Sequence, residues 1–136
     1  MSALTADRNT KRREAHKRVF PVAAGAVIFA GAMVGINAAG FAVPVTSVAT
    51  LKGAGRAERR ADNTGGANGA ISVEVSTGTF AFANSASADL LTQADCGNDV
   101  YGVDDQTVAK TSGSATRSVV GKVYDVDAAG VWVKFS

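Results

Sequence analysis

The longest hydrophobic segment of the chain spans residues 19–48, thirty residues without a charged side chain. Glycine or proline interrupts it at short intervals, and each interior glycine costs a helix about 1 kcal/mol relative to alanine, while proline costs about 3. Between the interruptions lie short pieces rich in Val, Ile and Phe, at residues 26–30, 32–36 and 41–45. This punctuation is typical of short strands, so we expect three strands here with a turn at residues 37–40.

The same segment has a second interpretation, as an export signal or membrane anchor. A basic run at residues 11–18 precedes it, and Ala30-Gly31-Ala32 resembles the small residues at a signal cleavage site. A membrane-spanning helix needs roughly 20 mostly apolar residues. Under this interpretation residues 1–45 are the signal or anchor, and a β-domain begins near Val43. The glycines, the prolines and the lack of leucine in the segment favour the strands.

Alternation of apolar and polar positions predicts a hairpin across residues 71–83. Ile71, Val73 and Val75 share one face of the first predicted strand, and Phe80 and Phe82 share one face of the second. Thr77 and Gly78 lie between the two strands and are suited to a turn. The two strands are therefore expected to pair with each other.

A second hairpin is predicted at the C-terminal end. Residues 119–126 and 131–135 read as strands, joined by a turn at residues 127–130. In the last strand the odd-numbered positions face one side, while Trp132 and Lys134 face the other.

The whole pattern amounts to eight or nine short strands with turns at nearly regular spacing. Such spacing predicts an all-β fold, either a small β-barrel or a sandwich of short antiparallel strands. At 136 residues the chain is long enough for one modest core. We expect a single β-domain over residues 19–136, preceded by an extended basic N-terminal arm over residues 1–18.

Charge is distributed unevenly along the chain. Residues 1–60 carry ten Lys or Arg and three acidic residues, a net of +7, whereas residues 61–136 carry four and nine, a net of −5. Basic residues cluster in the arm and again at residues 52–60. A basic half and an acidic half favour docking on charged partners or on copies of the same chain.

Residues suited to catalysis are few. His16 and Cys96 lie eighty residues apart, so a Cys–His pair is not expected, and Cys96 is predicted to be a buried, inert thiol. The sequence has no transition-metal motif and no phosphate-binding glycine loop. Acidic residues at 95–99, 104–105 and 125–127 could hold a hard cation through oxygen, but acids at turns more often bond their own backbone. We therefore expect no catalytic residues, no metal, no cofactor and no specific nucleic-acid partner.

Several pieces of the sequence, in order, resemble one protein family. The pieces are Gly31–Asn37, Gly40–Pro44, Asp62–Ala67, Val73–Val75, Gly78–Phe80, Asn98–Tyr101, Gly121–Asp127 and Val131–Val133. Together they resemble the small capsid cement, or head-decoration, proteins of tailed bacteriophages. Some members of that family, long described as a domain of unknown function, were mislabelled as recombinases. The absence of a phosphate-binding loop speaks against any such activity here.

The resemblance implies a structural protein on the outer surface of a phage capsid, made in the host cytoplasm and assembled into the virion. It implies a minor capsid protein that stabilises contacts between major capsid protein subunits and self-associates, as a homotrimer in preference to a dimer, without a membrane partner. The arm is not part of the family pattern, and we expect it to lie along the major capsid protein or a neighbouring copy. The candidate contact residues are the cations of the arm and of the second basic cluster: Arg8, Lys11, Arg12, Arg13, Lys17, Arg18, Arg56, Arg59 and Arg60.

Overall fold

The computed structural model describes residues 2–13 and 16–135. Met1, Glu14 and Ala15 of the predicted arm, and Ser136 of the predicted domain, lie outside the described residues. The described chain is an all-β sandwich of antiparallel sheets and does not close into a barrel. Of the two predicted architectures, the sandwich is therefore confirmed.

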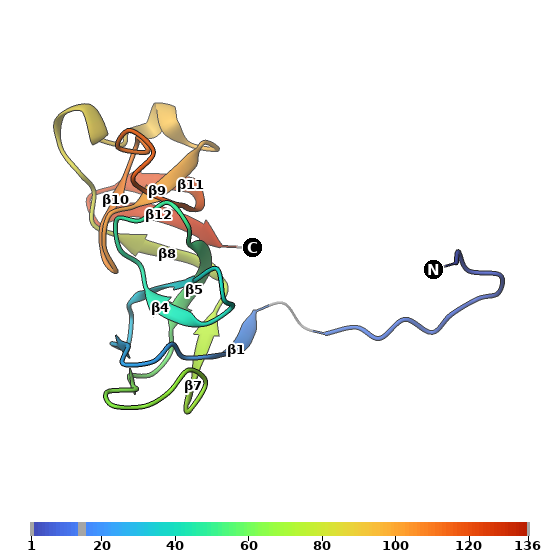
Figure 1. The fold of residues 1–136 in the computed structure, drawn as a ribbon. Helices are drawn as coiled ribbons and strands as arrows, with labels where there is room; N and C mark the ends of the chain where they lie inside the picture. Colours follow the sequence, from blue (N-terminus) through green and yellow to red (C-terminus); the bar gives the residue numbers. More distant parts are fainter. Residues whose placement is uncertain (1, 14–15, 136) are drawn as a thin grey trace.

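Two five-stranded sheets make up most of the fold (Figure 1). The first sheet has the order β1 (Lys17–Pro21), β7 (Ser72–Ser76), β5 (Lys52–Ala57), β3 (Met33–Ile36), β4 (Ala42–Pro44). The second has the order β10 (Val108–Ala109), β9 (Asp99–Gly102), β11 (Val119–Asp127), β12 (Gly130–Phe135), β8 (Gly78–Phe82). A small sheet pairs β2 (Val27–Ile28) with β6 (Ala61–Asp62), and two 3₁₀ turns, η1 (Ser87–Asp89) and η2 (Gln93–Asp95), lie between β8 and β9.

Residues 19–48 form strands, as predicted. β2, β3 and β4 fall within the three predicted pieces, and the turn between β3 and β4 is closed by Asn37, whose Oδ1 accepts hydrogen bonds from the backbone N–H groups of Ala39 and Phe41. Part of the segment stays on the surface, since Val19 is 67% and Phe29 is 55% exposed. Among the described residues, no helix has the length and apolar character needed to cross a bilayer.

The C-terminal hairpin is confirmed, and the hairpin across residues 71–83 is wrong. β11 pairs with β12, and Val131, Val133 and Phe135 are buried. β7 and β8 both form, but β7 pairs with β1 and β5 in the first sheet, while β8 pairs with β12 in the second. The chain changes sheet at Thr77–Gly78, where Gly78 adopts φ +137°, a conformation that favours glycine.

The two sheets enclose separate hydrophobic cores. One is centred on Val22, Ile28, Val73 and Val75 of the first sheet and its neighbours, and the other on residues of the second sheet such as Val131. The two sheets touch where β5 lies against β11. A Cβ on Gly53 would lie 2.0 Å from the carbonyl oxygen of Val120, so only glycine fits there.

Candidate docking surfaces

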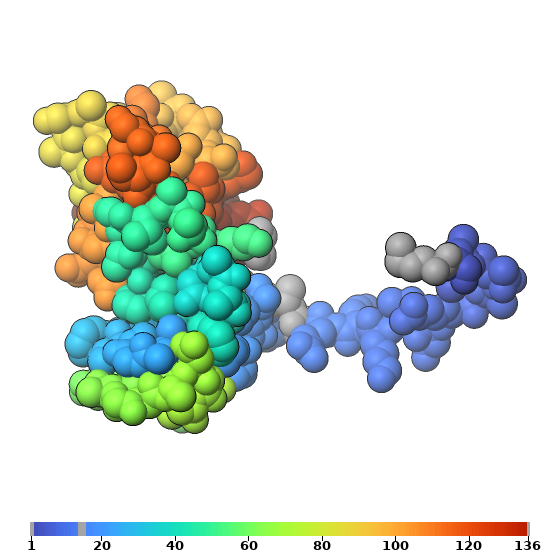
Figure 2. All heavy atoms as spheres, in the orientation of Figure 1, coloured from blue at the N-terminus to red at the C-terminus, as the bar shows by residue number. Residues whose placement is uncertain are grey.

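The first candidate surface is the N-terminal arm. Residues 2–13 are exposed throughout, and they extend away from both sheets (Figures 1 and 2). Their one backbone hydrogen bond among the described residues joins Thr10 to Arg8. Within residues 2–13 and 16–135, none of the four arm cations, Arg8, Lys11, Arg12 and Arg13, has an ion-pair partner. Four cations are thus presented to solvent on a segment whose described residues are all exposed.

The other two cations assigned to the arm belong to the first sheet. Lys17 and Arg18 lie in β1, whose side opposite β7 is a free sheet edge. The Lys17 ammonium is 3.4 Å from the Glu74 carboxylate, and the Arg18 guanidinium stacks 4.4 Å from the centre of the Phe20 ring. The Lys17–Glu74 ion pair and the pairing of β1 with β7 hold the arm's point of departure against the first sheet.

Arg56 connects the two sheets. From β5 its guanidinium donates a 2.8 Å hydrogen bond to Glu58 and lies 4.7 Å from the centre of the Phe80 ring on β8. The pKa of Glu58 is held below its usual value by a hydrogen bond from Ser76 and then by the bond from Arg56. This arginine is engaged within the fold, and its Nε is buried without a hydrogen-bond partner among the described residues.

Arg59 and Arg60 lie in the connection from β5 to β6. Arg60 is 3.7 Å from Asp62 and 5.3 Å from the centre of the exposed Phe29 ring. Both arginines line a shallow depression of about 290 Å³ that also includes Val19 of the edge strand. Of the second basic cluster, these two are therefore better placed than Arg56 to contact a partner.

A cationic cleft of about 660 Å³ lies where β5 meets β11 and β12. Its floor includes Gly53, Val119 and Val120, and four cations line it: Lys52, Arg117, Lys122 and Lys134. Sequence reasoning did not single out the last three. The alternation of apolar and polar residues in β11 and β12 could have identified Lys122 and Lys134 as outward-facing. In the structure the two lysines lie opposite each other on neighbouring strands, on the exposed face.

Two of these four cations are already paired. Lys122 is 2.8 Å from Asp99, and Arg117 is 3.1 Å from Asp89. Lys52 and Lys134 are exposed and have no ion-pair partner among the described residues. The cleft thus offers two uncommitted ammonium groups beside an apolar floor, an arrangement suited to an acidic segment of a partner.

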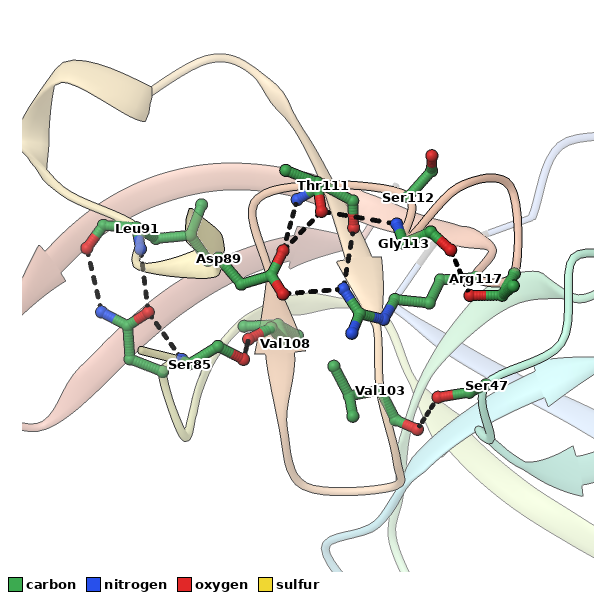
Figure 3. Close-up of polar contacts among 12 residues, drawn as sticks. Ser47, Ser85, Asp89, Leu91, Val103, Val108, Thr111, Ser112, Gly113 and Arg117 are labelled. Atoms are coloured by element: carbon green, nitrogen blue, oxygen red, sulfur yellow. Dashed lines mark hydrogen bonds and ion pairs between the residues drawn. The ribbon is translucent and has the colours of Figure 1, made fainter. Parts of the chain in front are cut away.

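Arg117 is fixed by a network that ties two loops together (Figure 3). Its Nη1 also donates to the carbonyl oxygen of Thr111 at 3.2 Å, and the Thr111 backbone N–H donates to the Asp89 carboxylate. The Thr111 hydroxyl donates to the same carboxylate oxygen. The Thr111 hydrogen bond, followed by that of Arg117, lowers the pKa of Asp89 despite its partial burial.

The acidic turn residues are occupied by local hydrogen bonds. Asp95 is buried and accepts from the Thr92 backbone N–H, which lowers its pKa, and Lys110 lies 3.6 Å away. Asp104 accepts from the Gln106 backbone N–H, and Asp127 accepts from that of Ala129. Across residues 2–13 and 16–135, no group of three His, Cys, Asp or Glu residues is arranged to hold a metal ion.

Cys96 is exposed, contrary to the expectation of a buried thiol. It follows η2 in a turn, and its Sγ lies 3.5 Å from the Gln93 side-chain oxygen. The residue lies between η2 and β9, outside both hydrophobic cores, so its side chain stays at the surface.

No protein family, curated protein or solved structure compared with this chain matches it significantly. Its function must therefore be argued from its own residues.

Proposed function

We propose that this protein is a capsid decoration protein that binds the outer surface of a phage head as a self-associating, non-catalytic subunit. The observation that carries the proposal is the exposed arm, which extends from a free sheet edge and presents four cations that have no ion-pair partner within residues 2–13 and 16–135. A segment of this kind gains stabilising contacts only when it lies on another molecule.

The geometry of the domain supports the same role. The free edge at β1 can pair with a neighbouring strand, and the cationic cleft can receive an acidic segment of a major capsid protein. On a shell with many repeated positions, weak contacts of each kind act together and raise the effective affinity. The ordered resemblance to the cement family points to a capsid as the repeated surface.

Binding to empty heads that lack the protein tests the proposal. The full chain should bind saturably, and binding should weaken at high salt because exposed charge pairs are screened. Replacing Lys52 and Lys134 by Gln should weaken binding at least tenfold, since each is exposed and neither pairs within the described chain. The matched control is Lys110→Gln, which removes an exposed cation that lies outside the cleft and is 3.6 Å from Asp95, and it should bind as tightly as the natural chain.

If the variant with Gln at positions 52 and 134 bound as tightly as the natural chain, the cleft would not be the capsid contact. If the natural chain failed to bind at any salt concentration, the decoration role itself would be wrong.

A further inference from the structure

A further pocket lies on the outward face of the second sheet. It has a volume of about 390 Å³ and is lined by Thr79, Tyr124, Asp125, Asp127 and Trp132. β8, β11 and β12 thus each contribute to it, so the pocket is part of the sheet and not of a loop. Two aromatic rings and two carboxylates therefore face solvent together.

The strand pattern explains why these side chains point outward. In β12 the buried Val131 and Val133 flank Trp132, which must face the opposite side. In β11 a bulge between Val123 and Asp125 interrupts the register with β12. Tyr124 lies in that bulge and is 64% exposed, because a bulge re-aims the side chain of its extra residue.

The pocket is held in shape before any ligand arrives. The Trp132 indole N–H donates to Asp127 Oδ2 at 2.9 Å, and Gln93 donates to Asp125 Oδ1 at 2.7 Å. Neither carboxylate has an ion-pair partner among the described residues. An ionised carboxylate has about four lone-pair sites. Asp125 accepts hydrogen bonds from Gln93 and Val126, and Asp127 accepts from Ala129 and Trp132, so each can still accept a hydrogen bond from a ligand.

Aromatic faces beside unpaired carboxylates are the chemistry that recognises a guanidinium or an ammonium group. The ring quadrupole attracts the cation, and the carboxylate forms a charge-assisted hydrogen bond with it. Arginine suits such a site best, because its planar group can stack on a ring and bond a carboxylate at the same time.

The chain itself carries the matching group. The arm has a net charge of +3 over residues 2–13, from Arg8, Lys11, Arg12 and Arg13 against Asp7. Its own direction takes it away from the domain (Figure 1). Twelve extended residues reach about 40 Å, so the arm extends well beyond the domain that it leaves (Figure 1).

We propose that this pocket receives a basic side chain of the N-terminal arm of a second copy, so that each subunit is fastened to its neighbour by the neighbour's arm. This contact is independent of the capsid, and it is tested on purified protein without heads. A failure here leaves the head-binding result untouched, and the reverse also holds.

Trp132 is the only tryptophan of the chain, so its fluorescence reports on the pocket directly. One full-length variant has the four arm cations replaced by Gln and keeps Trp132. A second full-length variant, Trp132→Phe, keeps the natural arm and gives no tryptophan signal. Titrating the second into the first should change the emission of Trp132 saturably, and about 0.5 M salt should suppress the change because it screens exposed charges.

Two controls separate arm docking from other contacts. A Trp132→Phe chain whose four arm cations are also replaced by Gln should leave the emission unchanged. Adding Asp125→Asn and Asp127→Asn to the fluorescent partner should abolish the response. The proposal would be overturned if the Trp132 emission changed equally with the natural arm and with the Gln-substituted arm, or if it changed with neither.

Sedimentation of single variants gives a second, independent readout. Tyr124→Ser alters a mostly exposed side chain and should weaken self-association of the full chain at least tenfold. The proposal would be contradicted if self-association were unchanged in the Tyr124→Ser variant and also unchanged in the variant whose four arm cations are replaced by Gln.

Discussion

Met33 and Val34 are adjacent in β3, yet their side chains are buried in different cores. Met33 packs with the residues of the second sheet, and Val34 packs with those of the first. Both are fully buried. Because successive side chains of a strand point to opposite faces, β3 is shared structurally by the two cores.

This arrangement predicts that the two sheets unfold together. Val34→Ala weakens the first core, and Trp132 in the second sheet reports the unfolding of the other half. The fluorescence and circular dichroism midpoints should both fall, and they should coincide. Met33→Ala should lower the free energy of unfolding by about 2–5 kcal/mol.

The matched control is Ala81→Ser, on an exposed position of β8, which should change stability by no more than about 0.5 kcal/mol. A fluorescence midpoint that Val34→Ala leaves in place would mean that the sheets unfold independently.

Gly53→Ala should destabilise the fold at the crossing of β5 and β11. The new Cβ would lie 2.0 Å from the Val120 carbonyl oxygen, and backbone atoms yield less easily than a flexible side chain. Overpacking of this kind costs about 1–3 kcal/mol, and a backbone clash belongs at the upper end. Denaturant unfolding measures the loss, and an unchanged midpoint would show that the sheets can separate there freely.

Acid should weaken the network around Asp89. The Thr111 and Arg117 contacts hold the pKa of this carboxyl below its ordinary value of 3.8, so its charged form favours the folded state. The contribution is complete above pH 3.8 and is lost as the pH falls below that value. Asp89→Asn should therefore lose less free energy of unfolding than the natural chain as the pH falls below 3.8. An equal dependence on pH in the two chains would mean that the ionised Asp89 does not stabilise the fold.

The N-terminal segment should be retained in the protein isolated from its natural source. Residues 27–45 contribute Ile28, Met33, Val34 and Val45 to the two cores, so removing residues 1–45 would delete β1 to β4. Intact-mass measurement should find these residues present. A chain beginning between residues 33 and 46 would instead support the export interpretation.

Local pattern was enough to predict much of the fold. The strands of residues 19–48 followed from glycine and proline spacing, and the hairpin of β11 and β12 followed from alternation around a short turn. Both signals are local, because they depend on residues a few positions apart. The buried face of β7 was also predicted, since Val73 and Val75 are buried.

Pairing between distant segments was not predictable in this way. The two-residue connection at Thr77–Gly78 suits a hairpin, but the side chains before it fill one core and those after it fill the other. β5 was missed for a related reason. Its sequence stands out only as part of a basic cluster, and its glycines are needed because Gly53 and Gly55 lie against other strands. Likewise, the cationic cleft depends on how two sheets meet, and the pocket at Trp132 depends on a bulge.

The most direct test of the central claim is the number of copies bound per head. Purified full-length protein is mixed in increasing amounts with empty heads that lack it, and bound copies are counted after the heads are sedimented. The account predicts saturation at a fixed ratio to the major capsid protein. A chain that stays in the supernatant, or that accumulates on heads without saturating, would contradict it.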